Sequence, residues 1–178
     1  SCPARASYFT GTYPSQNGVY NNVLNPPKIH GSYDPSLTHF SEVLRKAGYN
    51  LGLTGKWHVS DTENPADRGW DEIYPRATRE VYMGVSWEKW RELAQEKMDD
   101  SPRKRGEIIM PGYGRRPMYR TDDVAPEDHP DYRNDLMTVT KAIEAMKRYA
   151  KEGKPFCIHC GPGGPHDPYL VPKKYVDM

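Results

Sequence analysis

The sequence predicts an α/β fold with a mostly parallel sheet flanked by helices. Two segments carry this prediction, because each has an amphipathic helix that ends at a glycine and is followed by a short strand. The first pairs a helix at 37–47 with a strand at 49–54. The second pairs a helix that begins at 134 or 135 with a strand at 156–160. The residues that leave the ends of both strands are chemically distinctive, and open α/β sheets form their sites at those ends.

The N-terminal part predicts a short helix, a loop and the first helix–strand pair. Residues 3–11 are expected to form the short helix, because a proline at its first turn costs no hydrogen bond. Residues 14–34 are rich in Asn, Pro and Gly and are expected to form a loop. Ser36 is expected to cap the helix at 37–47, and Gly48 is expected to end it.

The central part of the chain predicts little regular structure. Residues 60–80 are interpreted as mostly loop, and 86–98 as a helix on the spacing of their tryptophans and leucine. Residues 99–133 show no useful period. They contain a set of basic residues, which either line a solvated loop or form a rim that meets an anionic substrate: Arg103, Lys104, Arg105, Arg115 and Arg116.

The last helix is the clearest one in the sequence. One of its faces is apolar, because apolar residues follow a three–four spacing: Leu136, Val139, Ile143, Met146 and Ala150. Gly153 ends this helix, and Pro155 prevents its continuation. The strand at 156–160 and the Gly- and Pro-rich loop at 161–168 follow, so the second distinctive loop leaves the carboxyl end of a predicted strand.

Composition excludes several classes of protein. The 178 residues fit one domain, and the net charge of +1 gives no reason to expect a nucleic-acid partner or a membrane surface. No apolar run approaches the roughly 20 residues that a membrane span needs. The three cysteines argue against a disulfide framework. Cys157 and Cys160 are interpreted as small side chains packed along a strand, with half of a zinc site or a redox pair as the alternative.

Five polar residues form a candidate site for an oxyanion ester. Ser1 stands at the N-terminus of a predicted helix with Arg5 one turn further on, which suits a bound sulfate or phosphate. Lys56 and His58 are two residues apart, so on an extended segment both side chains face the same pocket. His166 lies in the loop after the second strand, between prolines that stiffen it.

Four segments resemble motifs of the sulfatase family, in the order in which that family has them. Residues 1–5, Ser-Cys-Pro-Ala-Arg, followed by Thr-Gly at 10–11, resemble the signature Cys/Ser-x-Pro/Ala-x-Arg. Residues 48–58 are similar to the second signature, a Gly-Tyr pair that leads to Gly-Lys-x-His. Arg-Gly-Trp-Asp at 68–71 resembles a Gly-Phe-Asp turn, and 165–169 resemble a Pro-His-x-Pro loop.

The resemblance implies a fold and an activity. The family fold is the alkaline-phosphatase-like α/β sandwich, and residues 1–178 are expected to be part of one sulfatase catalytic domain that lacks its first strand and C-terminal portion. The expected activity is hydrolysis of a sulfate ester, with a sulfated carbohydrate or a small molecule as substrate. Two alternatives stay open: a phosphonate monoester or phosphodiester hydrolase that uses the same nucleophile, and a non-catalytic relative that only binds sulfated ligand.

The resemblance also implies a role for each site residue. Ser1 is the precursor of a formylglycine nucleophile, made by a maturation enzyme, and as formylglycine it is also a calcium ligand. Arg5 holds the hydrated aldehyde, Lys56 clamps the sulfate, and His58 hydrogen-bonds the nucleophile and helps to reform the aldehyde. His166 contacts the sulfate near the leaving oxygen.

Three points qualify this assignment. Ser1 stands where cysteine is commoner, so the chain is either a serine-type sulfatase, matured by a radical enzyme, or a Cys→Ser variant. Cys2 is out of register with the motif and is interpreted as a packed residue. The remaining calcium ligands are expected outside this chain, because the acidic pairs at 99–100 and 122–123 lie in the wrong segments. Family members are commonly exported, which implies a periplasmic or secreted location.

Overall fold

The computed structural model describes residues 1–23, 33–76, 102, 107–110, 114–117, 119–120, 130–166 and 169–170. The chain divides into two compact units, which are considered separately. The first contains residues 1–83 and 135–162, and the second contains 84–134 and 163–178. Within the described residues, none of the helices has the length and apolar character that crossing a membrane requires.

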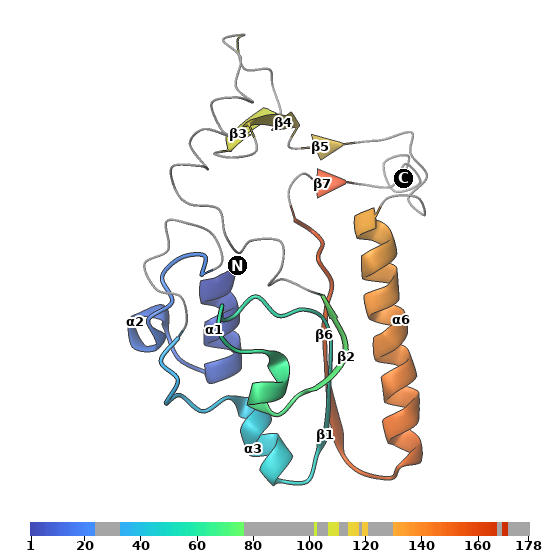
Figure 1. Ribbon diagram of the computed structural model, residues 1–178. Helices are drawn as coiled ribbons and strands as arrows, with labels where there is room; N and C mark the ends of the chain where they lie inside the picture. The colour runs from blue at the N-terminus through green and yellow to red at the C-terminus, as the bar shows by residue number, and fades with distance from the viewer. Residues whose placement is uncertain are drawn as a thin grey trace. The chain divides into compact units, whose positions relative to one another are not determined.

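The first unit contains the predicted parallel sheet. Its three described strands are β1 (Asn50–Lys56), β2 (Asp71–Arg76) and β6 (Phe156–Gly161), in the order β2-β1-β6. Both pairings are parallel, and β1 faces β6 in unbroken register from Asn50 opposite Phe156 to Gly55 opposite Gly161. The carboxyl ends of the two predicted strands therefore lie side by side, as Figure 1 shows.

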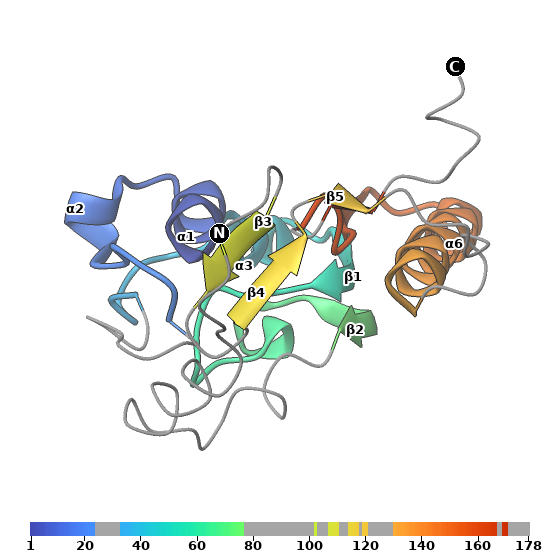
Figure 2. The same cartoon turned by 90° about the horizontal axis from the view of Figure 1, so that it is seen from above.

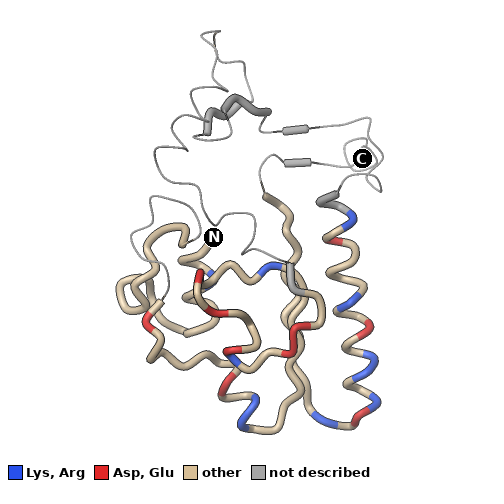
Figure 3. Tube along the Cα trace, in the orientation of Figure 1, with Lys and Arg blue, Asp and Glu red and all other residues tan. Residues whose placement is uncertain are grey.

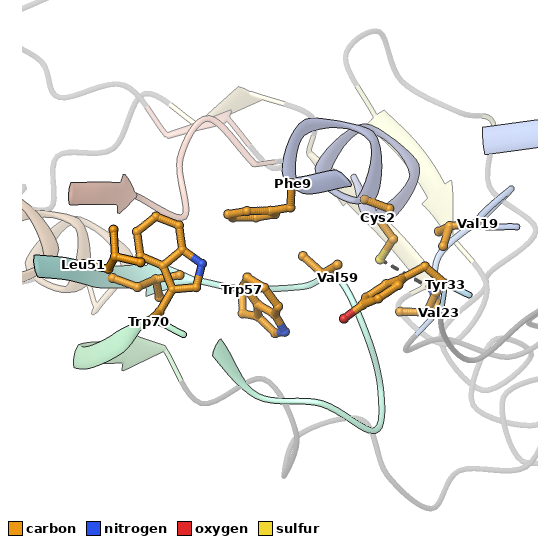
Figure 4. Close-up of a cluster of buried hydrophobic side chains, with 11 residues drawn as sticks. Cys2, Phe9, Val19, Val23, Tyr33, Leu51, Trp57, Val59 and Trp70 are labelled. Atoms are coloured by element: carbon orange, nitrogen blue, oxygen red, sulfur yellow. Dashed lines mark hydrogen bonds between the residues drawn. The ribbon is translucent and has the colours of Figure 1, made fainter. Parts of the chain in front are cut away.

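Helices cover both sides of this sheet. Helix α1 (Cys2–Thr10) and α3 (Phe40–Lys46) lie on one side, and α6 (Pro130–Lys151) lies on the other (Figures 1 and 2). The core fills the space between the sheet and α1. Phe9 on α1 is fully buried and packs against Trp57, with their ring centroids 4.8 Å apart (Figure 4). The predicted layered α/β arrangement is confirmed.

Helix α6 packs on the sheet through a different face from the apolar one. Its buried residues are small or hydrogen-bonding, namely Thr138, Ala142, Ala145 and Tyr149. The helix comes close because β1 carries glycine at two positions beneath it. A β-carbon at Gly52 would lie 3.3 Å from the Tyr149 ring, and one at Gly55 would lie 2.7 Å from Cγ2 of Thr138.

The apolar stripe of α6 faces outward instead. Exposed fractions on this stripe run from 40% for Val139 to 55% for Leu136, with Ile143 and Met146 between them. Charged residues alternate down the same helix, as Figure 3 shows. The three–four spacing thus identified the helix correctly but marked the face that points away from the sheet.

Two helices begin elsewhere than predicted. Helix α3 begins at Phe40, because Glu42 caps it by accepting a hydrogen bond from the backbone N–H of His39 at 2.7 Å. Ser36 instead belongs to a turn closed on the carboxylate of Asp34. The predicted stop is confirmed, since Gly48 has φ of 86° and the N–H of the next residue bonds back to the last turn. Helix α6 begins at Pro130, before the predicted start.

The predicted loops at 14–34 and 60–80 contain regular structure. A four-residue helix, α2 (Pro14–Asn17), opens the first, and a 3-10 turn, η1 (Pro65–Arg68), precedes strand β2 in the second. Strand β2 escaped prediction because it contains a proline and has no alternating pattern. It lies at one end of the three described strands, where a missing N–H is tolerated.

A buried arginine ties these segments together. Arg68 is 7% exposed, and its guanidinium reaches Glu63 at 2.8 Å and Glu42 at 3.4 Å. It also donates to the hydroxyl of Tyr33 and to two backbone carbonyls. Burial acts to lower the pKa of Arg68, but its bonds to the two carboxylates outweigh burial and raise that pKa. The Arg-Gly-Trp-Asp motif is therefore a structural anchor in this fold.

The second unit contains short strands where the sequence showed no period. Strand β3 (Glu107–Met110) pairs antiparallel with β4 (Gly114–Pro117), and β5 (Tyr119–Arg120) pairs parallel with β7 (Tyr169–Leu170). The prediction of an irregular 99–133 is wrong at these strands, which are too short to show an alternating pattern. The helix predicted at 86–98 and the acidic pairs lie outside the described residues.

Candidate active site

The site begins at the first turn of α1. Ser1 occupies the N-cap position, and its carbonyl accepts a hydrogen bond from the N–H of Arg5 at 3.1 Å. The helix is fixed in the core by Cys2, Ala6 and Phe9, each fully buried. The Ser1 side chain itself is exposed. A hydroxyl is thus held at the positive end of a helix that is anchored along its opposite side.

His58 supplies the group that meets this hydroxyl. Its Nδ1 lies 3.0 Å from Oγ of Ser1, although 57 residues separate the two in sequence. The residue is 6% exposed, and its φ of 55° lies in the left-handed region, which is uncommon for a residue with a side chain. Such strain persists where surrounding contacts enforce it, and it clusters at functional sites.

The backbone at His58 corrects one step of the sequence argument. Strand β1 ends at Lys56, and the chain turns at His58 rather than continuing extended. The rule that residues two apart share a face therefore does not apply between them. His58 instead reaches Ser1 because the left-handed turn at His58 redirects its side chain. The predicted meeting of Ser1 and His58 therefore depends on this turn and not on an extended strand.

Arg5 links the helix to the end of β1. Its Nη1 donates to the carbonyl of Lys56 at 2.7 Å and to that of Trp57 at 3.4 Å. Burial lowers the pKa of Arg5, and the neighbouring Cys2 partly offsets this. Burial dominates and raises the pKa of the Cys2 thiol, while the N–H of Val23 and the positive charges of Lys56 and Arg5 favour its thiolate. Positive charge is therefore concentrated around the first turn of α1.

Asn22 belongs to the site and was missed by sequence reasoning. Its Oδ1 lies 3.1 Å from Nε2 of His58 and 3.3 Å from Sγ of Cys2. Cys2 Sγ also accepts a hydrogen bond from the N–H of Val23 at 3.5 Å, drawn dashed in Figure 4. Cys2 is packed in the core, as expected, and is also hydrogen-bonded. No sequence signal marked Asn22, since it lies in an irregular segment among other asparagines.

Not all predicted site residues are brought together. His166 is exposed and belongs to the second unit, so its role stays a prediction. The cysteines of β6 are unpaired, with Cys157 half-buried and Cys160 exposed. Within the described part of the chain, no three His, Cys, Asp or Glu side chains gather as they would around a metal ion. These residues therefore do not by themselves fit a calcium site.

Comparison with known proteins identifies the family. The family model described as Sulfatase matches residues 1–178, the whole of the chain. The chain belongs to the sulfatase family. The pairing of Ser1 with His58 thus joins the first residue of one sulfatase signature to the last residue of the other. The two motifs, predicted separately, therefore meet at this contact.

Individual sulfatases and their neighbours agree with this assignment. Over 99% of its length the chain is 26% identical to choline-sulfatase of Rhizobium meliloti (strain 1021), of which it covers 31%. The solved structure of Ps i-CgsB in complex with k-i-k-neocarrahexaose matches 94% of the chain at a TM-score of 0.56 and 21% identity, over 35% of that structure. Phosphonate monoester hydrolase SpPMH from Silicibacter pomeroyi matches all of the chain at a TM-score of 0.56 and 20% identity, again over 35% of that structure.

These matches confirm the predicted alkaline-phosphatase-like fold, present here as part of a domain. The chain spans about a third of the length of the curated sulfatase that it matches over nearly its whole length. The solved neighbours, at this level of identity, speak for the fold alone.

Proposed function

We propose that the complete protein hydrolyses sulfate esters, with a formylglycine derived from Ser1 as its nucleophile. The observation that carries this proposal is the contact of 3.0 Å between Oγ of Ser1 and Nδ1 of His58. It supports the proposal because a nucleophile needs a neighbouring group that can accept and return its proton. Family membership over the whole chain supports the reaction class.

The residues around Ser1 suit a developing negative charge. The N-terminus of α1 presents its backbone N–H groups and the positive end of the helix dipole. The described hydrogen bonds of Arg5 use Nη1, so its remaining N–H groups can meet an anion. Lys56 is the last residue of β1 and is proposed to clamp the sulfate, and His166 is proposed to contact the sulfate near the leaving oxygen.

Formylglycine supplies, in its hydrated form, a hydroxyl that attacks sulfur and a second hydroxyl whose deprotonation expels sulfate and restores the aldehyde. His58, whose Nδ1 lies 3.0 Å from Oγ of Ser1, is proposed to accept and return that proton. The serine-type maturation enzyme, with its own oxidant, removes two hydrogen atoms from Ser1. Calcium ligands are proposed to come from parts of the protein beyond the described residues, since these do not assemble a site.

The proposed substrate class is a sulfated carbohydrate. The support is a resemblance in fold to Ps i-CgsB, solved with k-i-k-neocarrahexaose. The neighbouring phosphonate monoester hydrolase has a comparable TM-score, so fold likeness alone does not separate sulfate from phosphonate esters. The choice of sulfate rests on the family match and on the curated choline-sulfatase.

The decisive experiment compares matured and unmatured protein. The complete protein is produced with a serine-type maturation enzyme, and the mass of the peptide that carries Ser1 is measured. We expect a loss of two hydrogen atoms, together with turnover of 4-nitrophenyl sulfate that exceeds turnover of a phenylphosphonate monoester.

The matched control is Ser1→Ala, which removes the precursor hydroxyl and leaves the helix intact. Faster turnover of the phosphonate would replace the proposal by its alternative. Complete conversion of Ser1 without turnover of either ester or of a sulfated oligosaccharide would leave a protein that only binds its ligand. A second variant, Ser1→Cys with a cysteine-type maturation enzyme, tests the same site if serine is not converted.

A further inference from the structure

Asn22 stands behind His58 on the side away from Ser1. Its amide oxygen lies 3.1 Å from Nε2 of His58, while Nδ1 of the same ring lies 3.0 Å from Oγ of Ser1. The three side chains thus form one line of hydrogen bonds that ends at the position of the nucleophile. Each comes from a different segment, namely α1, the stretch after α2, and the turn after β1.

The hydrogen bonds determine which ring nitrogen of His58 carries the proton. A carbonyl oxygen only accepts, so Nε2 must donate to Asn22. In the neutral ring Nδ1 then has no proton and accepts from the group at position 1. If the amide were reversed, its NH₂ would donate to Nε2, and the ring proton would then lie on Nδ1. Nδ1 would donate to the hydroxyl at position 1 and could not accept a proton from it.

Cys2 also faces the amide oxygen of Asn22. Its sulfur accepts the N–H of Val23 and lies 3.3 Å from the amide oxygen of Asn22, to which its S–H donates. All of these hydrogen bonds are satisfied at once when the amide oxygen, not the NH₂, faces both neighbours. Val23 is fully buried, so the backbone beside Asn22 is anchored in the core.

We propose that Asn22 is a positioning residue that holds the neutral ring of His58 in its Nε2–H form, with Nδ1 directed at residue 1. The effect of Asn22 on catalysis rests on the proposed function, in which Nδ1 of His58 accepts a proton from the nucleophile at residue 1. Residues that orient a reacting group in this way commonly contribute 10–100-fold to activity. The line Asn22–His58–residue 1 follows the logic of a nucleophile, a base and a third group that orients the base.

The first test reads the tautomer directly and requires no activity. The complete protein is labelled with ¹⁵N-histidine, and its long-range ¹H–¹⁵N correlation spectrum is recorded at pH 8, where an ordinary imidazole is neutral. His58→Gln identifies the His58 signals. We expect an Nε2–H ring in the wild type and loss of that preference in Asn22→Leu. An Nδ1–H ring in the wild type would overturn the proposal without any Asn22 variant.

The second test separates positioning from general damage to the fold. Asn22→Leu removes the acceptor at similar volume, Asn22→Asp keeps an acceptor oxygen, and Cys2→Ala removes the other donor to the same amide oxygen. Conversion of Ser1 is checked by mass in each variant. We expect kcat for 4-nitrophenyl sulfate to fall about 30-fold in Asn22→Leu with KM changed less than about threefold. Asn22→Asp should recover most of kcat, and Cys2→Ala should lose little.

The outcomes distinguish the two proposals. Equal kcat in Asn22→Leu and the wild type, at equal conversion of Ser1, would overturn the role of Asn22 and leave the sulfatase proposal standing. A wild type that is fully converted but hydrolyses no sulfate ester would overturn the proposed function, and the tautomer measurement would still decide whether Asn22 orients His58.

Discussion

Replacing Gly55 by alanine tests whether the turn that carries Lys56 and His58 is built on close backbone contact. Gly55 has φ of 84°, and a β-carbon there would overlap the carbonyl oxygen of Gly161 and lie 2.7 Å from Cγ2 of Thr138. One obstacle is backbone on the neighbouring strand and the other is a buried side chain of α6. Neither can swing aside as the end of a flexible side chain could, so the strand pairing itself must shift.

Two costs add at this position. The left-handed conformation costs alanine about 1–2 kcal/mol relative to glycine. Forcing a methyl group into a packed site typically costs about 1–3 kcal/mol more. Gly55→Ala should therefore lower the free energy of unfolding by about 2–5 kcal/mol. Gly48→Ala is the matched control: its φ is 86°, but nothing lies within 4 Å of a β-carbon there, so only the first cost applies.

The assay is urea unfolding of the complete protein, followed by tryptophan fluorescence, because Trp57 and Trp70 are both buried in this core. The difference in unfolding free energy between the two variants measures the packing cost alone, since their backbone strain is shared. If Gly55→Ala were no less stable than Gly48→Ala, the close approach of β1 to β6 and α6 would be wrong. Loss of turnover in Gly55→Ala at temperatures where it remains folded would further show that the turn positions Lys56 and His58.

Three further predictions concern stability. Arg68→Met leaves two carboxylates and a buried hydroxyl without their partner and should destabilise the protein by about 3 kcal/mol. Its control, Lys141→Met, breaks an exposed ion pair and should change stability by less than about 1 kcal/mol. Equal losses of unfolding free energy in urea for the two variants would contradict this account. Burial, aided by the charge of Arg68, lowers the pKa of His39 from 6.5 to about 4, and neither of its ring nitrogens has a hydrogen-bond partner among the described residues. The unfolded state therefore binds more protons between these values, so thermal stability should be complete above pH 6.5 and fall as pH drops towards 4; His39→Phe should reduce this dependence, and an unchanged pH profile of the melting temperature would refute it. Tyr149→Phe removes a hydrogen bond of 2.8 Å to Asp71 and should cost about 1 kcal/mol, measured by the shift in urea midpoint; no shift would show that the bond contributes nothing.

The sequence predicted those parts of the molecule that depend on local pattern. Helix α3 and strand β1 were predicted from an apolar spacing that ends at a glycine. Strand β6, the parallel partner of β1, was predicted in the same way. The five candidate residues could be proposed from the sequence because each belongs to a short motif whose residues are neighbours along the chain. Ser1 and His58 lie in hydrogen-bond contact and Arg5 bonds the backbone beside His58, while their catalytic roles stay predictions.

The parts that escaped prediction depend on tertiary contacts. Strand β2 has no pattern of its own and exists because β1 offers it a pairing edge. The side chain that caps α3 belongs to Glu42, which lies inside the helix, whereas the predicted cap, Ser36, lies in front of it. Asn22 joins the site through tertiary contacts with Cys2 and His58, and no spacing in the sequence predicts those contacts.

The outward apolar stripe of α6 has a consequence for handling the 178-residue chain in solution. Leu136, Val139, Ile143 and Met146 meet water along one side of the helix, and such a stripe is a candidate for self-association. The charged side chains interspersed along α6 carry more positive than negative charge and oppose association by repulsion, so association should increase with salt. Light scattering of the chain at rising ionic strength, against a variant with Ile143→Lys, would show whether colloidal behaviour is set by this one helix.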